Sequence, residues 1–269
     1  MEPLLLRPRD LAPARVGPGN DRWHPVVTAE GRPVLRGDER TLWAGRCEVG
    51  EDRFTPEQDD LDPVWRLPSL ADVVVTDQRV MFTCAAWNVG GGYSSIGAPL
   101  TAAVMNVASK AAAAARRRGT VVVGQMRWEW LAHVQVLWGS STAGGRLRRA
   151  SSVPGTVSLL TKAFRVPGYP ALRLSGGDLG DDASLRRMAG LVLGAVAEHH
   201  LGHDADLGLV DAERDRLRRM AAEARSDPPG PTGGGGFRLA IPGSLLLWFL
   251  SKDEYQSPDA ASILRGEDR

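Results

Sequence analysis

The stretch Ala71-Asp-Val-Val-Val-Thr-Asp-Gln-Arg-Val-Met-Phe-Thr-Cys84 decides the fold prediction. Two runs rich in β-branched and apolar residues flank a polar step at residues 76–79, which is typical of two strands joined by a tight turn. Successive side chains of a strand point to opposite faces, so each run has one apolar face. We therefore expect an antiparallel hairpin that lies in the core. The residues expected to face the core are Val73, Val75, Val80, Phe82 and Cys84.

The composition is that of a globular protein without a strong overall electrostatic field. Of the 269 residues, 43% are hydrophobic and 24% are charged, and the net charge is +1. Such a balance would not steer nucleic acid toward the chain, so we expect no nucleic-acid partner. The 31 glycines and 18 prolines gather toward the ends and indicate irregular chain there.

The cysteines and the first residues bear on the compartment. Cys47 and Cys84 both fall in strand-like runs, and two cysteines are too few for a disulfide framework or a multi-cysteine zinc site. We expect both to be reduced core residues. The leucines at residues 4–6 are followed at once by Arg7-Pro-Arg-Asp10, which is unlike a secretory signal, so we expect a cytoplasmic protein.

The first half of the chain divides at Gly37. Residues 1–36 carry many Pro, Gly and Arg without periodicity, which predicts a flexible N-terminal arm. We expect a strand over residues 41–49 and a long acidic surface loop over residues 50–70. The run from Pro99 to Arg118 is rich in alanine and ends in three arginines before a glycine, which predicts a helix.

The second half alternates strands and then helices. We expect strands over 121–130, 134–138, 156–162 and 171–174, with Met126, Trp128 and Trp130 facing one way and Gln125, Arg127 and Glu129 the other. Asp181-Asp182 then precede a helix over residues 183–198 with Leu185, Met188, Val192 and Val196 on one face. Residues 204–236 are read as a charged helix from about Ala212 to Arg225 and a Gly/Pro linker, and residues 237–269 as an apolar tail segment.

Three of these segments together resemble a known family. They are Gly37-Asp-Glu-Arg-Thr-Leu-Trp-Ala-Gly-Arg46, the hairpin step Thr76-Asp77-Gln78-Arg79, and Arg127-Trp-Glu-Trp-Leu-Ala-His-Val134. With the closing strand and helix, residues 37–203 resemble the bacterial pleckstrin-homology and GRAM-like domains. The resemblance implies an α+β fold: a bent antiparallel sheet or partly open barrel of about seven strands with a C-terminal capping helix. The helix at residues 99–118 would be inserted between the third and fourth strands.

The resemblance implies binding rather than catalysis, with lipid headgroups, peptides and proteins among the family's ligands. In its lipid-binding members, phosphates meet basic residues between the first two strands, whereas residues 50–70 here are acidic and would repel a phosphate. We therefore expect a non-enzymatic intracellular module that recognises a protein or peptide and needs no cofactor. Two alternatives stay open: a peripheral membrane or anionic-lipid binder, and an enzyme whose site the motifs do not reveal.

Candidate site residues are few. Basic side chains that could contact an anion or a lipid are Arg116, Arg117, Arg118, Arg146, Arg148, Arg149 and Lys162. The first three would equally stabilise a helix end through its dipole, and the others could form a solvated strand face. His199 and His203 would share a helix face near Asp204 and Asp206, but no third ligand has a metal-site spacing, so we expect an exposed helix end and no bound metal. His133 stands alone and is interpreted as structural.

The tail offers a further expectation. Residues 237–250 are apolar, but they include Arg238 and Pro242 and are too few to span a bilayer as a helix. Its leucines, with Trp248 and Phe249, are too apolar to stay in water without consequence. We therefore expect the tail to dock on the domain, pairing with a sheet edge or covering a groove.

Overall fold

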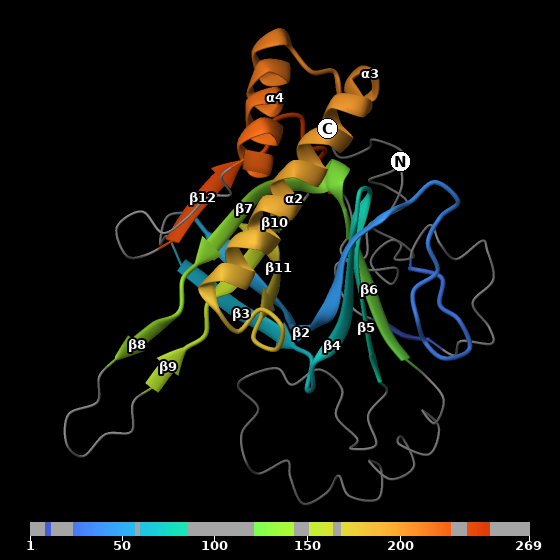
Figure 1. Ribbon diagram of the computed structural model, residues 1–269, viewed down its shortest axis with the longest axis vertical. Helices are drawn as coiled ribbons and strands as arrows, with labels where there is room; N and C mark the ends of the chain where they lie inside the picture. Colours follow the sequence, from blue (N-terminus) through green and yellow to red (C-terminus); the bar gives the residue numbers. More distant parts are fainter. Residues whose placement is uncertain are drawn as a thin grey trace, which may run out of the picture.

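The computed structural model describes residues 9–11, 24–56, 60–85, 121–142, 151–163, 168–226 and 236–247. Ten of the strands in these residues form one sheet, β2 belongs to both of its halves, and α2 crosses one face (Figure 1). The elements in chain order are β1 (Arg9–Leu11), β2 (Thr41–Thr55), β3 (Asp60–Arg66), β4 (Ala71–Thr76), β5 (Arg79–Ala85), β6 (Val121–Arg127), the 3₁₀ turn η4 (Trp128–Trp130), β7 (Leu131–Leu137), β8 (Ser140–Thr142), β9 (Ser151–Val153), β10 (Thr156–Thr161), β11 (Tyr169–Ser175), α2 (Asp182–Gly202), α3 (Asp204–Leu207), α4 (Asp211–Ser226) and β12 (Gly236–Ala240).

The expected hairpin is confirmed as β4 and β5. The two strands pair antiparallel, with Val73 opposite Phe82 and Val75 opposite Val80. These four side chains and Cys84 are buried in the main core. The hydroxyl of Thr76 accepts hydrogen bonds from two backbone N–H groups of the turn. The polar residues of the turn thus satisfy one another locally, while the apolar strands on either side lie in the core.

Strand β2 joins the two halves of the sheet. Its residues 41–47 pair with β4, whereas residues 48–54 pair with β11 and residues 50–55 also pair with β3. The expectation of a surface loop over residues 50–70 is therefore wrong. These strands accommodate acidic residues because the side chains have partners: Trp65 donates a hydrogen bond to Glu51, and Arg66 forms an ion pair with Asp52.

The expected fold class is also wrong. Instead of about seven strands, the main sheet has ten, in the order β1-β6-β5-β4-β2-β11-β10-β7-β12 with β3 beside β2, and β8 and β9 form a separate pair. The extra strands β1, β3 and β12 come from segments without a clear apolar alternation, and they join through backbone pairing. The inserted helix expected from Pro99 to Arg118 lies outside the described residues.

Helix α2 covers the apolar face of the half formed by β7, β10 and β11. The carboxylate of Asp181 accepts a hydrogen bond of 2.8 Å from the backbone N–H of Ser184 and so caps the helix. The expected apolar face is confirmed, since Leu185, Met188, Val192 and Val196 are all buried. Helix α4 lies against α2 and matches the charged helix expected at residues 212–225 (Figure 1).

The expected alternation over residues 121–130 is only partly correct. Strand β6 ends at Arg127, and the tryptophans that follow are in η4. Gln125 and Arg127 are buried although they face away from Met126. A reason is that residues 24–40 cover this face: Glu39 pairs with Arg79 there, and a Cβ atom at Gly31 would lie 2.7 Å from Val121.

The docking of the tail is confirmed for residues 236–247. Strand β12 pairs antiparallel with β7, and the N–H groups of Ile241 and Leu247 donate to the carbonyls of Ala132 and Lys162 at 2.8 Å each. Leu247 is fully buried. Among the described residues, none of the helices is long and apolar enough to cross a bilayer. The alternative in which the tail binds a membrane surface does not require such a helix.

Candidate functional site

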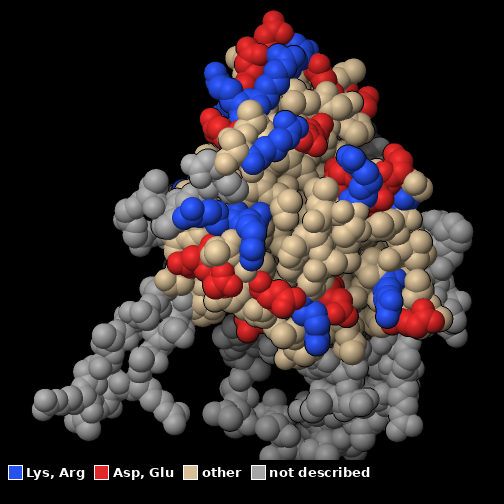
Figure 2. Space-filling model, in the orientation of Figure 1, with Lys and Arg blue, Asp and Glu red and all other residues tan. Residues whose placement is uncertain are grey.

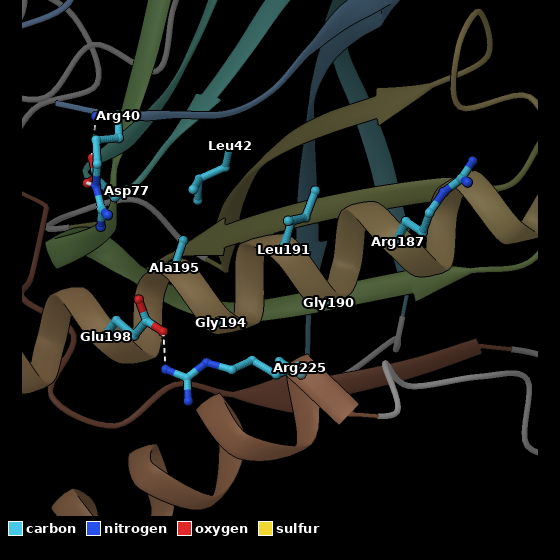
Figure 3. A pocket seen from close by; sticks show the side chains of 11 residues that line it. Arg40, Leu42, Asp77, Arg187, Gly190, Leu191, Gly194, Ala195, Glu198 and Arg225 are labelled. Atoms are coloured by element: carbon cyan, nitrogen blue, oxygen red, sulfur yellow. Dashed lines mark hydrogen bonds and ion pairs between the residues drawn. The ribbon is translucent and has the colours of Figure 1, made fainter.

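A cavity of about 430 Å³ opens between α2, the beginning of β2 and the end of α4. We call it the α2 groove. Figure 3 shows the side chains of Leu42 and Leu191 on its two sides, with charged residues toward its ends. The residues that line it are Arg40, Leu42, Asp77, Arg187, Gly190, Leu191, Gly194, Ala195, Glu198, Ala224 and Arg225.

The groove exists because α2 presents small side chains on this face. Gly190 lies about one turn before Gly194 and Ala195, and these small residues leave the helix backbone close to the cavity. A glycine inside a helix costs about 0.5–1 kcal/mol relative to alanine. At Gly194 a Cβ atom would meet only the Cβ of Ala224 at 3.7 Å, an ordinary contact. Close packing therefore does not require this glycine, and its effect is to keep the cavity open.

Most of the charges at the rim neutralise one another. The guanidinium of Arg40 lies 2.9 Å from the carboxylate of Asp77, and Arg225 pairs with Glu198. Burial raises the pKa of Asp77, but the hydrogen bonds and charge of Arg40 outweigh this effect and lower the pKa overall. Figure 2 shows an uncharged surface in the middle of this face with both signs of charge around it. The groove thus has an apolar centre and a polar rim.

One edge of β2 is open beside α2. Residues 41–45 have β4 as their only neighbour among the described strands. The backbone N–H and C=O of Arg46 both point away from β4. The carbonyl accepts a hydrogen bond from the N–H of Asp178 at 2.8 Å, and the N–H donates to the Asp178 carboxylate at 2.7 Å. Hydrogen-bond directions alternate along an antiparallel strand, so the backbone groups of Ala44 point to that same open side.

Of the basic residues singled out in the sequence, Lys162 is the one that the structure describes. The three arginines at residues 116–118 and those at 146, 148 and 149 lie outside the described residues, so their proposed patches stay predictions. Lys162 follows β10 and is exposed, and its carbonyl anchors Leu247 of the tail. Lys162 does not line the α2 groove.

The histidines near the end of α2 have structural roles. Within the described ranges, no cluster of three or more His, Cys, Asp or Glu side chains could hold a metal ion. His199 stacks on His203 at 4.2 Å and lies 3.5 Å from Glu129. The buried His200 contacts the carbonyls of Trp128 and Pro242 at 2.8 and 2.7 Å, so it joins η4 to the tail. His133 packs edge-on against Tyr169, in agreement with its structural interpretation.

Neither cysteine has the properties of a nucleophile. Both are free thiols and both are buried, as expected. Burial, together with the negative charges of Asp178 and Glu48, raises the pKa of Cys47 to about 12. Burial likewise raises the pKa of Cys84. Thiolate chemistry depends on the deprotonated form, which is therefore disfavoured at both positions.

Searches with this chain against family models, curated proteins and solved structures found no match. The groove residues were missed by sequence reasoning because they come from four separated segments. One signal was present in the sequence, since Gly190 and Gly194 interrupt an otherwise strong helix at a spacing of one turn. The pairing of Arg40 with Asp77 had no such signal.

Proposed function

We propose that this protein is a non-enzymatic binding module that holds a protein or peptide segment in the α2 groove. The observation that carries the proposal is the groove itself, with Leu42, Leu191 and small α2 residues at its centre and ion pairs at its rim. An apolar centre with a polar rim is the usual anatomy of a protein interface. The rim carboxylates Asp77 and Glu198 are engaged by arginines, so neither is a free general base.

The open edge of β2 favours an extended partner. An added strand would pair with the outward N–H and C=O of Ala44, as Asp178 already does with Arg46. Alternate side chains of such a strand would enter the groove between Leu42 and Leu191. Strand addition supplies affinity through the main chain and specificity through side-chain pockets. The partner is therefore an extended polypeptide segment with an apolar residue at its centre.

Selection of peptides on the full-length protein tests this function. A random displayed-peptide library provides ligands, and fluorescence polarisation of labelled synthetic peptides gives their affinities. Gly194→Phe should fill the groove and weaken binding at least about tenfold, which corresponds to about 1.4 kcal/mol. Val210→Glu is the matched control, because Val210 is an exposed apolar residue that does not line the groove.

The result can contradict the proposal in two ways. Selected peptides that bind Gly194→Phe and the unchanged protein equally well would place the site elsewhere. A protein that selects no peptide but sediments with anionic vesicles, less so at higher salt, would favour the membrane-surface hypothesis instead. Circular dichroism and thermal unfolding of each variant show whether the fold is retained.

A further inference from the structure

A row of polar side chains crosses the face of the sheet that is turned away from α2. Ser158 of β10 lies directly opposite Gln135 of β7 on one side and Arg173 of β11 on the other. Directly opposed residues share a face, with Cβ atoms about 4.5–5.5 Å apart. The neighbouring β10 residues Val157 and Leu159 point into the core with α2, so the polar row lies on the opposite face.

Each member of this row has a buried polar atom without a partner. Within the described residues, the Oε1 of Gln135, the Oγ of Ser158 and the Nε of Arg173 have no hydrogen bond. Ser158 is 0% exposed. A buried polar group left unpaired is destabilising, and folded proteins rarely leave neighbouring ones unpaired. Three adjacent side chains with unused hydrogen-bonding capacity can converge on one polar ligand.

The residues that surround Arg173 on this face include a second arginine. Its neighbours on this face are small, namely Gly50, Ser158, Ala171 and Ser175. The side chain of Arg66 lies over Gly50, where an added Cβ atom would be 2.5 Å from the Arg66 Cδ. A second guanidinium group therefore borders the small residues beside Arg173.

The charged side chains around Arg173 interact with residues other than Arg173. Arg66 pairs with Asp52, and a Glu48 carboxylate oxygen accepts a hydrogen bond of 3.3 Å from Ser175. Arg173 has no hydrogen bond or ion pair among the described residues. Burial, followed by the charge of Arg66, lowers the pKa of Arg173 despite the two carboxylates. An anion at this point would relieve the repulsion between the two guanidinium groups.

We propose that Gln135, Ser158 and Arg173 form a binding site for one phosphate group. The guanidinium of Arg173 donates through Nε and a terminal nitrogen, and the hydroxyl of Ser158 donates to another oxygen. The Gln135 amide completes the row, because its oxygen and nitrogen can exchange places by a flip. A tetrahedral phosphate offers oxygens to all three side chains at once, whereas a planar carboxylate offers two. This site is independent of the α2 groove on the other face of the sheet.

Titration with inorganic phosphate tests the proposal in the full-length protein. Nuclear magnetic resonance of the arginine Nε–H groups reports Arg173 directly, and calorimetry gives the affinity. Phosphate should shift the Arg173 signal saturably, and Ser158→Ala should weaken binding several-fold. Arg173→Gln should abolish it. Arg46→Gln is the control, since Arg46 forms an exposed ion pair with Asp72 on the other half of the sheet.

Two further measurements assign the phosphate source and guard against misfolding. Phosphatidic acid vesicles that bind the unchanged protein but not Arg173→Gln would identify a lipid headgroup as the source. Phosphate binding without vesicle binding would identify a soluble phosphate. Absence of a saturable shift overturns the proposal, and so does a Ser158→Ala variant that binds phosphate as tightly as the Arg46→Gln control. If Arg173→Gln does not fold, Arg173→Lys replaces it, because it keeps the charge and loses the Nε donor.

Discussion

Replacing Arg79 by methionine should strongly destabilise the fold. Its guanidinium reaches the carboxylate of Glu39 at 2.9 Å through Nε and 2.8 Å through Nη2, and both side chains are 0% exposed. The remaining terminal nitrogen donates to Gln125 at 2.7 Å. Arg79→Met would leave the Glu39 carboxylate buried without its cation. Breaking a buried ion pair in this way costs about 3–5 kcal/mol.

A double-mutant cycle separates the pair from its surroundings. Arg79→Met combined with Glu39→Leu removes both charges, so the double variant should be more stable than Arg79→Met alone. Urea unfolding at pH 7, followed by tryptophan fluorescence, measures the free energies of all four proteins. A cost below about 1 kcal/mol for Arg79→Met, or strict additivity in the cycle, would refute the reasoning.

The same pair predicts a dependence on pH. Burial raises the pKa of Glu39, but hydrogen bonds from Arg79, the Arg36 backbone and Thr76 outweigh it and hold the pKa below its ordinary value of 4.5. A lowered folded-state pKa adds stability above the unfolded-state pKa, and this stability is lost as the pH falls through the folded-state pKa. Glu39→Gln should therefore flatten the decline of unfolding free energy below about pH 4.5. An unchanged slope would contradict this assignment.

Two other substitutions test the core and the tail. Phe82→Ala should cost about 3–5 kcal/mol in urea unfolding because the ring is fully buried, and a cost below about 1 kcal/mol would contradict the strand faces. His200→Ala should speed proteolysis within residues 241–247, since it removes the contacts to Pro242 and Trp128, whereas His203→Ala should not; equal cleavage of both would contradict the role of His200.

The elements that could be predicted from the sequence are those with strong periodicity. The hairpin around Val75 and Val80 and the apolar face of α2 both follow from side-chain spacing, and both bury that face in the same core. The apolar character of the tail predicts docking, and Leu247 is fully buried, whereas Leu245 and Leu246 remain exposed. In each case the local pattern and the tertiary environment favour the same structure.

The elements that could not be predicted depend on partners distant in sequence. The sequence of β3 predicts a loop because Asp60, Asp62 and Pro63 disfavour a strand, yet pairing with β2 overrides that preference. Arg79 and Glu39 were unrecognisable as buried because each is buried only through the other, across 40 positions. The polar row of the second proposed site likewise depends on register between three strands, which no local pattern encodes.

The segment that precedes the first long strand also shapes the α2 groove. Glu39 is held in the interior by Arg79, and the next residue, Arg40, forms the groove rim with Asp77. The backbone carbonyl of Arg40 also accepts a hydrogen bond from the N–H of Asp77 at 3.1 Å. The buried pair therefore fixes where the hairpin turn meets β2, and with it the position of one end of the groove. A change in the buried pair should reach the proposed binding site through two routes, the peptide link from Glu39 to Arg40 and the hydrogen bond of Thr76, next to Asp77, to Glu39.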